Sequence, residues 1–252
     1  MSRSSKSSKL RELDLERDLD ELATKRRYVR TLFDTVETSY DRFTRLFSFG
    51  MDGRWKQRLV RLVGESGPPV GRVLDLATGT GDIAKAVSER WPETTVVGLD
   101  LSLAMLRRTT PGRPRDKSLR SAGDMMALPH PSGGFSVVTA GYGFRNSPDC
   151  SKSLAEVHRV LPVGGRLASL DFYLPENPVW RVLFVEYLRI TGRVAGRLAH
   201  GVPEAYGYIA ASLERWMTAS EFSRLLAEFG FEVEIERRML LGGIAIHVAR
   251  KR

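Results

Sequence analysis

The chain has 252 residues, of which 42% are apolar and 27% are charged, a balance typical of a folded globular protein. Its single cysteine, Cys150, excludes a disulfide scaffold and a multi-cysteine metal site, and it suits a reducing compartment such as the cytoplasm. The histidines are scattered without an HExxH pair, so we expect no metal site. No uncharged apolar run approaches the ~20 residues of a membrane span, and the basic N-terminus lacks the apolar stretch of a secretory signal.

The net charge is +9, and residues 107–120 and 189–197 are locally basic. Neither segment carries the interleaved aromatic side chains of a platform for single-stranded nucleic acid, so we expect no nucleic-acid partner. A solvated basic surface is the main interpretation, and contact with an acidic membrane surface or an anionic substrate is the alternative. Peripheral membrane contact and a homodimer therefore stay open as expectations for a cytoplasmic protein.

The first part of the chain is predicted to be helical. Residues 1–9 contain only Ser, Lys and Arg after the initial Met and are expected to be disordered. Residues 10–27 set leucines among dense charges, which predicts an amphipathic, largely exposed helix and makes residues 1–27 a charged extension. Apolar residues then continue at helical spacing, with a short helix at 53–64. We expect residues 28–66 to form a helical cap at the start of a domain that runs to residue 252.

After residue 67 the pattern changes to alternating strands and helices, and it continues to residue 172. Short apolar runs bounded by turn residues predict buried strands, and segments with helical periodicity separate them. This alternation is typical of an α/β protein with an open, doubly wound, mostly parallel sheet that is covered by helices. Ser102 is expected to cap one of the helices, and Ser147 or Asp149 another.

The C-terminal part combines a helical insert with two final strands. Residues 175–216 are rich in aromatic side chains and show no strand pattern, so we expect a helical substrate lid there. A helix that ends at Gly230 follows. Residues 231–240 and 242–252 then predict two strands that form an antiparallel edge.

The most informative motif is DLATGTGD at residues 75–82, between a predicted strand and a predicted helix. Glycines there let the backbone turn sharply and approach a ligand, and the helix N-terminus offers free amides. Gly79, Gly81 and Ala84 fit the GxGxxA form of a dinucleotide site, with Asp100 at the distance expected for a ribose contact. An NAD-dependent oxidoreductase is therefore one interpretation of this motif.

Three aspartates favour a different ligand. Asp75, Asp100 and Asp124 each end a predicted strand, so they would line one crevice at the carboxyl edge of the sheet. A carboxylate aimed into the glycine loop suits a cationic head group better than a pyrophosphate. S-adenosylmethionine (SAM) has such a head, with an ammonium and a sulfonium. Each aspartate alone is also explained as a helix cap or turn residue, but the ordered set favours SAM.

At this point the chain resembles the class I SAM-dependent methyltransferases, including the turn LPVGGRL at residues 161–167. More specific elements are FDTVETSYD at 33–41, RWK at 54–56, GFRN at 143–146 and YGYIAAS at 206–212. Through these elements the chain is similar to the UbiE-type C-methyltransferases of ubiquinone and menaquinone biosynthesis. The resemblance implies a mostly parallel seven-stranded Rossmann-like sheet, SAM as the cofactor, and an aromatic or quinol-like small molecule as the methyl acceptor.

The resemblance also implies which residues hold the cofactor. One group would hold the methionine part of SAM, a second would hold the ribose hydroxyls, and a third would flank the adenine. The methionine group consists of Asp75, Ala77, Gly79 and Gly81. The ribose group consists of Asp100 with its neighbour Leu101, and the adenine group consists of Asp124 and Met125.

On the acceptor side, Arg145 in the GFRN loop and Tyr40 from the N-terminal helices are the residues that the resemblance implies. Carbon methylation of a phenolic ring needs an electron-rich phenolate, and an unperturbed phenol titrates near ~10. Arg145 is a poor proton acceptor because its guanidinium stays charged, so its expected role is to stabilise the phenolate. His200 is the histidine that we would test as a general base.

The sequence departs from the family pattern in two places. Thr44 and Arg45 stand where the family usually carries Asn-Asp, and Trp216-Met217 replaces the usual Phe-Pro after Ser212. Both changes fall in elements expected to face the substrate, not in the cofactor loop. A C-, O- or N-methyltransferase of specialised metabolism is therefore an alternative to quinone methylation, and a non-catalytic interaction protein of the same fold is a third interpretation.

Overall fold

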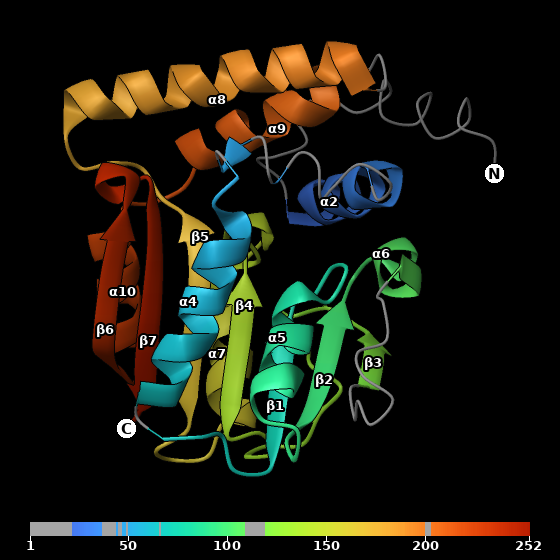
Figure 1. Cartoon of the computed structure of the whole chain (residues 1–252), viewed down its shortest axis with the longest axis vertical. Coiled ribbons are helices and arrows are strands. Elements are labelled where there is room, and N and C mark those ends of the chain that lie inside the picture. The colour runs from blue at the N-terminus through green and yellow to red at the C-terminus, as the bar shows by residue number, and fades with distance from the viewer. Residues whose placement is uncertain are drawn as a thin grey trace.

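The computed structural model describes residues 22–36, 44, 47–48, 50–65, 67–108, 119–199 and 203–252. Within these residues, helices cover both faces of one central sheet, and a further group of helices lies across one of its ends (Figure 1). This is the α/β arrangement expected from the alternating strands and helices. No helix among the described residues is both long and apolar enough to span a bilayer.

The sheet has seven strands in the order β3-β2-β1-β4-β5-β7-β6. The first five of these pair in parallel, while β7 pairs antiparallel with both β5 and β6. The expected doubly wound, mostly parallel sheet is thus confirmed, and the antiparallel edge consists of β6 with β7 inside it. The strands are β1 (Arg72–Leu76), β2 (Thr95–Asp100), β3 (Leu119–Ala122), β4 (Val137–Gly141), β5 (Arg166–Phe172), β6 (Phe231–Met239) and β7 (Ile244–Lys251).

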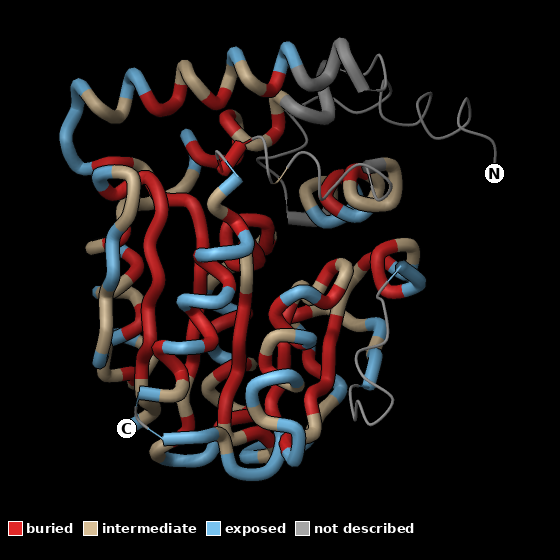
Figure 2. Tube along the Cα trace, in the orientation of Figure 1, coloured by how far each residue is buried: buried red, intermediate tan, exposed pale blue. Residues whose placement is uncertain are grey.

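Two apolar layers hold the sheet between its helices. The helices α4 (Asp52–Glu65) and α5 (Asp82–Arg90) cover one face, and α7 (Cys150–Val160) and α10 (Ala219–Glu228) cover the other. The inner strands are buried along almost their whole length (Figure 2), as expected for parallel strands covered on both faces. The sheet is therefore a rigid frame that fixes the positions of the loops at its carboxyl edge.

Local capping explains where several helices begin. Ser102 accepts a hydrogen bond from the backbone N–H of Met105 at 3.1 Å, at the start of α6 (Leu103–Arg108). Asp149 caps α7 by accepting from the backbone N–H of Lys152 at 3.0 Å. Both caps were expected from the sequence, with Asp149 rather than Ser147 as the cap of α7. The capping box of α10, formed by Thr218 and Glu221, was not anticipated.

Three helices lie over the carboxyl ends of the strands (Figure 1): α2 (Leu22–Val36), α8 (Pro178–Ala199) and α9 (Pro203–Glu214). Helices α8 and α9 occupy the region that was expected to be helical from its aromatic-rich pattern. Of the predicted charged extension, residues 1–21 lie outside the described residues, while residues 22–27 form the first turns of α2. The bounds of the cap and of the lid stay predictions.

Candidate active site

A cavity opens at the carboxyl ends of β1, β2 and β4. Helix α2 forms one wall through Val29 and Phe33, and the loops after the three strands form the others. This is the position at which open parallel sheets bind ligands. Of the residues that we expected to hold the cofactor, six line this cavity: Ala77, Gly79, Asp100, Leu101, Asp124 and Met125.

The loops after β1 and β4 are held in strained backbone conformations. Gly79 and Gly81 have φ angles of +56° and +88°, which explains the need for glycine in this loop. Ala77 and Tyr142 also have positive φ angles, at +49° and +58°, although they carry side chains. Such conformations cost on the order of 1–3 kcal/mol each and gather at functional sites.

The same two loops also approach each other closely. A Cβ atom on Gly143 would lie 3.0 Å from the Cβ of Ala77, so only glycine fits there without movement. The two loops therefore pack against each other at Ala77 and Gly143.

Asp75 lies under the glycine loop and is fully buried. Its two carboxylate oxygens accept hydrogen bonds of 2.6 Å each from the hydroxyls of Thr78 and Thr139. Burial raises the pKa of Asp75 to about 6, against the lowering effect of these hydrogen bonds. Asp75 thus orders the loop and adds negative charge below it, and it lines a second, smaller recess beside the main cavity.

The smaller recess contains an ionic cluster that sequence reasoning did not assign. Lys56 lies between Asp52 and Asp82, with its Nζ 2.7 Å and 2.8 Å from their carboxylates. The hydroxyl of Tyr142 donates to Asp52 at 2.9 Å. The only sequence signal was the RWK element, which ends at Lys56 and rested on the family resemblance alone.

The charges around this recess decide between the two cofactor interpretations. Asp75, Asp82 and Lys56 line it, and Asp52 supports Lys56 from below. Carboxylates thus outnumber the cation, and Asp82 stands in the first turn of α5, where a pyrophosphate would have to sit. This environment suits the ammonium and sulfonium of SAM and repels the two negative charges of a dinucleotide pyrophosphate.

Asp100 ends β2 and turns its carboxylate into the cavity wall. It accepts hydrogen bonds of 2.8 Å from the backbone N–H groups of Gly79 and Ser102. Burial raises its pKa above the ordinary value, and the nearby Asp34 carboxylate adds to this effect. Asp100 is therefore fixed in orientation by the glycine loop itself, as a residue that holds a ribose diol would need to be.

Asp124 and Met125 follow β3 at the far end of the same cavity. Asp124 accepts a hydrogen bond from the backbone N–H of Met126 at 2.9 Å, and its other oxygen lies 2.8 Å from Nε of Arg26. Arg26 comes from α2, so the N-terminal helix contacts the end of the cavity where the adenine is expected. No motif or period in the sequence relates Arg26 to Asp124.

The loop after β4 forms a short helical turn, η1 (Phe144–Asn146), which contains Arg145. Only 4% of the Arg145 side chain is exposed, and its Nε lies 3.5 Å from the buried carboxylate of Asp171. Its guanidinium also hydrogen-bonds the Ser212 hydroxyl on α9 and lies over the ring of Phe172 at 5.6 Å. Arg145 does not line the cavity, whereas its neighbour Asn146 does.

Asn146 links the β4 loop to the helices above it. Its side-chain amide donates to the backbone oxygen of Tyr142 at 2.6 Å and accepts from the Tyr208 hydroxyl at 2.9 Å. The ring of Tyr208 stacks on that of Tyr28, with centroids 5.4 Å apart. Helices α2 and α9 are thereby joined over the loop. Tyr40 and His200, the other acceptor-side candidates, lie outside the described residues.

Solved structures share the architecture of this chain. A SAM-dependent methyltransferase from Aquifex aeolicus superposes with a TM-score of 0.55 over 82% of this chain and 97% of its own, at 16% identity. One from Mesorhizobium loti gives a TM-score of 0.54 over 77% and 96%, at 18% identity. At these identities the likeness shows the fold alone, which is the Rossmann-like fold of these two proteins.

Sequence relatives then define the family. The ubiE/COQ5 methyltransferase family matches residues 21–251. A demethylmenaquinone methyltransferase of Thermus thermophilus is 39% identical over 86% of this chain and 98% of its own length. A ubiquinone/menaquinone biosynthesis C-methyltransferase UbiE of Syntrophotalea carbinolica is 36% identical over 85% and 90%. The protein belongs to the ubiE/COQ5 methyltransferase family, and its cofactor is SAM.

Proposed function

We propose that this protein transfers the methyl group of SAM to a ring carbon of a quinol in quinone biosynthesis, with a demethylmenaquinone-type ring as the acceptor. The names of its relatives support this assignment, because the similarity extends over nearly their whole length. SAM, when bound, supplies the methyl group as a substituent of its sulfonium.

One observation carries the proposal on the side of the structure. The cavity has a polar end, where Asp100, Asp124 and Arg26 lie, and an apolar wall with Val29, Phe33 and Tyr142. An apolar wall next to a cofactor pocket accommodates a flat aromatic ring, and it excludes water that would otherwise compete for the methyl group. Bound in one cavity, donor and acceptor would be held in line for displacement.

The protein must also favour the ionised acceptor, since a free phenol titrates near ~10. Arg145 brings a permanent positive charge to the loop after β4, and Asp171 and Ser212 hold it there. We therefore propose that Arg145 is a positioning residue, which fixes the loop of Asn146 and lowers the pKa of the acceptor hydroxyl through its charge. Tyr40 as a substrate contact and His200 as a base stay predictions from the sequence.

One departure from the family pattern has a packing role. The Trp216 ring lies 6.5 Å from that of Tyr173 and 6.2 Å from that of Phe222, between β5 and α10. Met217 accepts a backbone hydrogen bond from Leu174 at 3.0 Å. Neither residue lines the cavity, so this change gives no reason to replace the quinol by an acceptor of specialised metabolism. Arg45 lies outside the described residues.

The test is a product analysis with the purified protein, SAM that carries an isotope-labelled methyl group, and a demethylmenaquinol with a shortened tail. We expect the label on a ring carbon in the NMR spectrum of the product. A labelled ether or amine product would favour the O- or N-methyltransferase alternative, and no product with any quinol would contradict the proposal. Calorimetric titration with SAM and with NAD distinguishes a methyltransferase from an NAD-dependent oxidoreductase. We expect binding heat from SAM and none from NAD.

Peripheral membrane contact, a homodimer and a cytoplasmic location stay predictions.

A further inference from the structure

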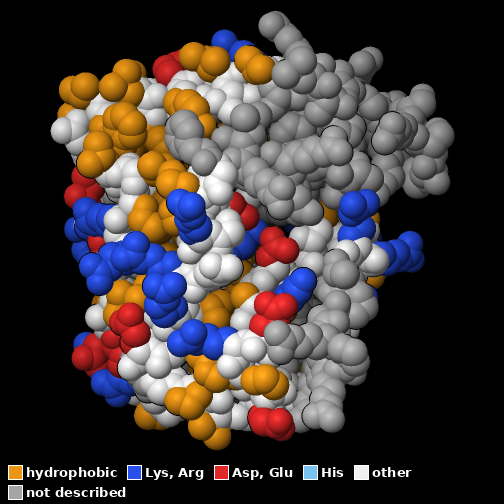
Figure 3. Space-filling view, viewed as in Figure 1, with side chains coloured by type: hydrophobic (Ala, Val, Ile, Leu, Met, Phe, Trp, Pro, Cys, Tyr) orange, Lys and Arg blue, Asp and Glu red, His pale blue; other side chains and the backbone are white. Residues whose placement is uncertain are grey.

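Helix α8 is apolar on the side that faces solvent. Five of its aliphatic side chains are between 48% and 69% exposed, and together we call them the α8 stripe: Val179, Val182, Leu183, Ile190 and Val194. Val182 and Leu183 follow Val179 by three and four residues, Ile190 follows Leu183 by seven, and Val194 follows Ile190 by four, spacings that place side chains along one face of a helix. The space-filling view shows hydrophobic side chains along this edge of the molecule (Figure 3).

The opposite side of α8 is also apolar. Phe184, Val185 and Leu188 are at most 6% exposed and pack into the core over β5 and α9. Exposed aliphatic side chains that gather along a helix whose opposite side is already buried are normally covered by protein or by lipid. Among the described residues nothing covers the stripe, so it has the character of a docking surface.

The apolar surface extends beyond α8. Leu241, in the turn η2 (Leu240–Gly242), is 76% exposed and has a φ angle of +51°. The indole N–H of Trp180 donates to the Leu240 oxygen at 2.9 Å, which fixes this turn beside the start of α8. Leu241, Val179 and Leu183 line one groove between the two elements.

Charge identifies the partner. The sequence of α8 contains four arginines and one glutamate. Glu186, that glutamate, pairs with Arg189, and Arg193 is exposed next to Val194 in the stripe. An apolar stripe flanked by arginines complements a bilayer with anionic headgroups. A second copy docked on the same face would bring two helices of excess positive charge together, which disfavours a dimer there.

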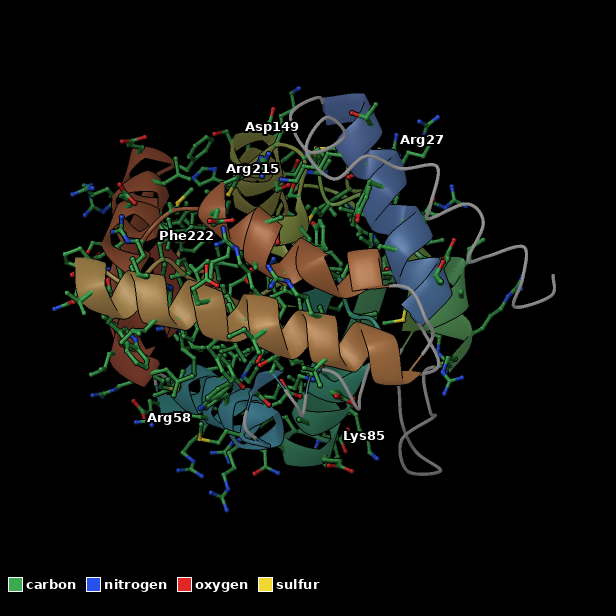
Figure 4. The ribbon with its side chains drawn as sticks, turned by 90° about the horizontal axis from the view of Figure 1, so that it is seen from above. Arg27, Arg58, Lys85, Asp149, Arg215 and Phe222 are labelled. Atoms are coloured by element: carbon green, nitrogen blue, oxygen red, sulfur yellow. The ribbon has the colours of Figure 1, made fainter. Side chains whose placement is uncertain are left out.

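We propose that the α8 stripe and Leu241 dock this protein on an anionic lipid bilayer, with α8 parallel to the membrane surface. Helix α8 lies across the carboxyl edge of the sheet (Figures 1 and 4), so this orientation turns the edge that carries the cavity toward the lipid. The argument rests on the residues of α8 and does not depend on which acceptor the enzyme methylates.

The experiment is co-sedimentation of the full chain with vesicles that contain phosphatidylglycerol and with vesicles of phosphatidylcholine alone. We expect binding to the anionic vesicles that weakens with salt. The variant V182D/I190D should lose about tenfold or more of this binding, because two exposed aliphatic side chains become charged. Arg193→Glu should weaken it as well, by a smaller factor that vanishes at high salt.

Matched variants separate docking from a general effect of charge. Val163 is 77% exposed in the turn before β5, at the amino edge of the sheet, so Val163→Asp makes the same chemical change away from α8. Arg58 is exposed on α4 (Figure 4), and Arg58→Glu is the control for Arg193→Glu. Neither control should alter vesicle binding. SAM affinity by calorimetry and the melting temperature should stay unchanged in all four variants, and V182S/I190S replaces the aspartate variant if that variant does not fold.

Three outcomes would overturn the proposal. The first is no binding of the unaltered chain to anionic vesicles, and the second is equal binding by the stripe variants. The third is a dimer in sedimentation velocity that dissociates in V182D/I190D, since the stripe would then be an interface between two copies. All three leave the methyl-transfer assay with a short-tailed quinol untouched, so failure here is distinct from failure of the proposed function.

Discussion

Arg26 of α2 pairs with Asp124 after β3, with 2.8 Å between its Nε and one carboxylate oxygen. The two residues are 98 positions apart, and Asp124 is the residue expected to accept the adenine amino group. A carboxylate has about four lone-pair sites, so it can hold Arg26 and a ligand donor together. Helix α2 is therefore tied to the end of the cavity where the cofactor is expected to lie.

Arg26→Ala should speed the dissociation of SAM. Without the pair, α2 closes less firmly over the cavity, and we expect a severalfold loss of affinity, in line with the ~0.2–1 kcal/mol of a partly exposed ion pair. Stopped-flow dissociation measures this directly. The neighbouring Arg27 is exposed and points away from the cavity (Figure 4), so Arg27→Ala is the control. Equal dissociation rates for the two variants would contradict the role of Arg26.

Asp100→Ala should weaken SAM binding by about ten- to a hundredfold, because a charge-assisted hydrogen bond to the ribose is worth ~1.5–3 kcal/mol. The variant also loses the contacts to the N–H groups of Gly79 and Ser102, so a lower melting temperature is expected. Asp100→Asn keeps one acceptor oxygen, so its affinity for SAM should lie between those of the unaltered chain and Asp100→Ala. Calorimetric affinities for the three proteins decide the matter, and an unchanged affinity in Asp100→Ala would remove Asp100 from the cofactor site.

Gly79→Val should abolish SAM binding. Gly79 has a φ angle of +56°, which is strained for any residue with a Cβ and most of all for a β-branched one. A Cβ there would also lie 3.4 Å from Cε of Met105, at the cavity wall. Near-native affinity in a folded Gly79→Val variant would mean that this loop is only a turn. Glycine at 133, with a φ angle of +65° and nothing near its Cβ, gives the control Gly133→Ala for backbone strain without a ligand.

Asp75 should make stability and cofactor affinity respond to pH in opposite directions. Burial raises its folded-state pKa from 3.8 to about 6, so the folded chain binds more protons than the unfolded chain between these values. The stability from the neutral carboxyl is present below about pH 4 and is lost as the pH rises through about 6. Affinity for cationic SAM should instead increase over the same range, because the charged carboxylate attracts it.

Asp75→Asn provides the check on this behaviour. In the unaltered chain the free energy of unfolding should fall by on the order of 3 kcal/mol as the pH rises from about 4 through about 6. Denaturation curves of Asp75→Asn should not show this fall. Calorimetry should show SAM affinity that no longer rises through pH 6. If the variant retains both dependences, another group is responsible for them.

Arg145→Ala should destabilise the protein by ~3–5 kcal/mol, because it leaves the Asp171 carboxylate buried without its cation. Arg145→Lys keeps the charge and tests the positioning role. We expect it to fold, to bind SAM normally and to lose about tenfold or more in kcat, since lysine lacks the planar fork. Because lysine retains the positive charge, the pH profile of kcat should stay in place in Arg145→Lys and move upward in Arg145→Gln, which removes the charge and makes the acceptor harder to ionise. A fall in kcat without any shift of the profile in Arg145→Gln would reduce Arg145 to a structural anchor.

The sequence by itself determined the class of fold and the cofactor end of the site. Strand and helix periodicities and caps such as Asp149 depend on residues that are close in the sequence, so they can be predicted without knowledge of the tertiary structure. The glycine loop and the aspartates at positions 75, 100 and 124 lie at one edge of the sheet for a similar reason. Parallel strands place their carboxyl ends together whatever the details of packing.

Only the tertiary structure decided how distant side chains meet. The contacts of Lys56 with Asp82, of Arg26 with Asp124 and of Arg145 with Asp171 join elements that no period or motif relates. The same holds for α8, whose apolar residues could all have been core until packing buried Phe184 and left Ile190 in solvent. A helical pattern specifies which residues share a face, but the direction of that face depends on where the rest of the chain lies.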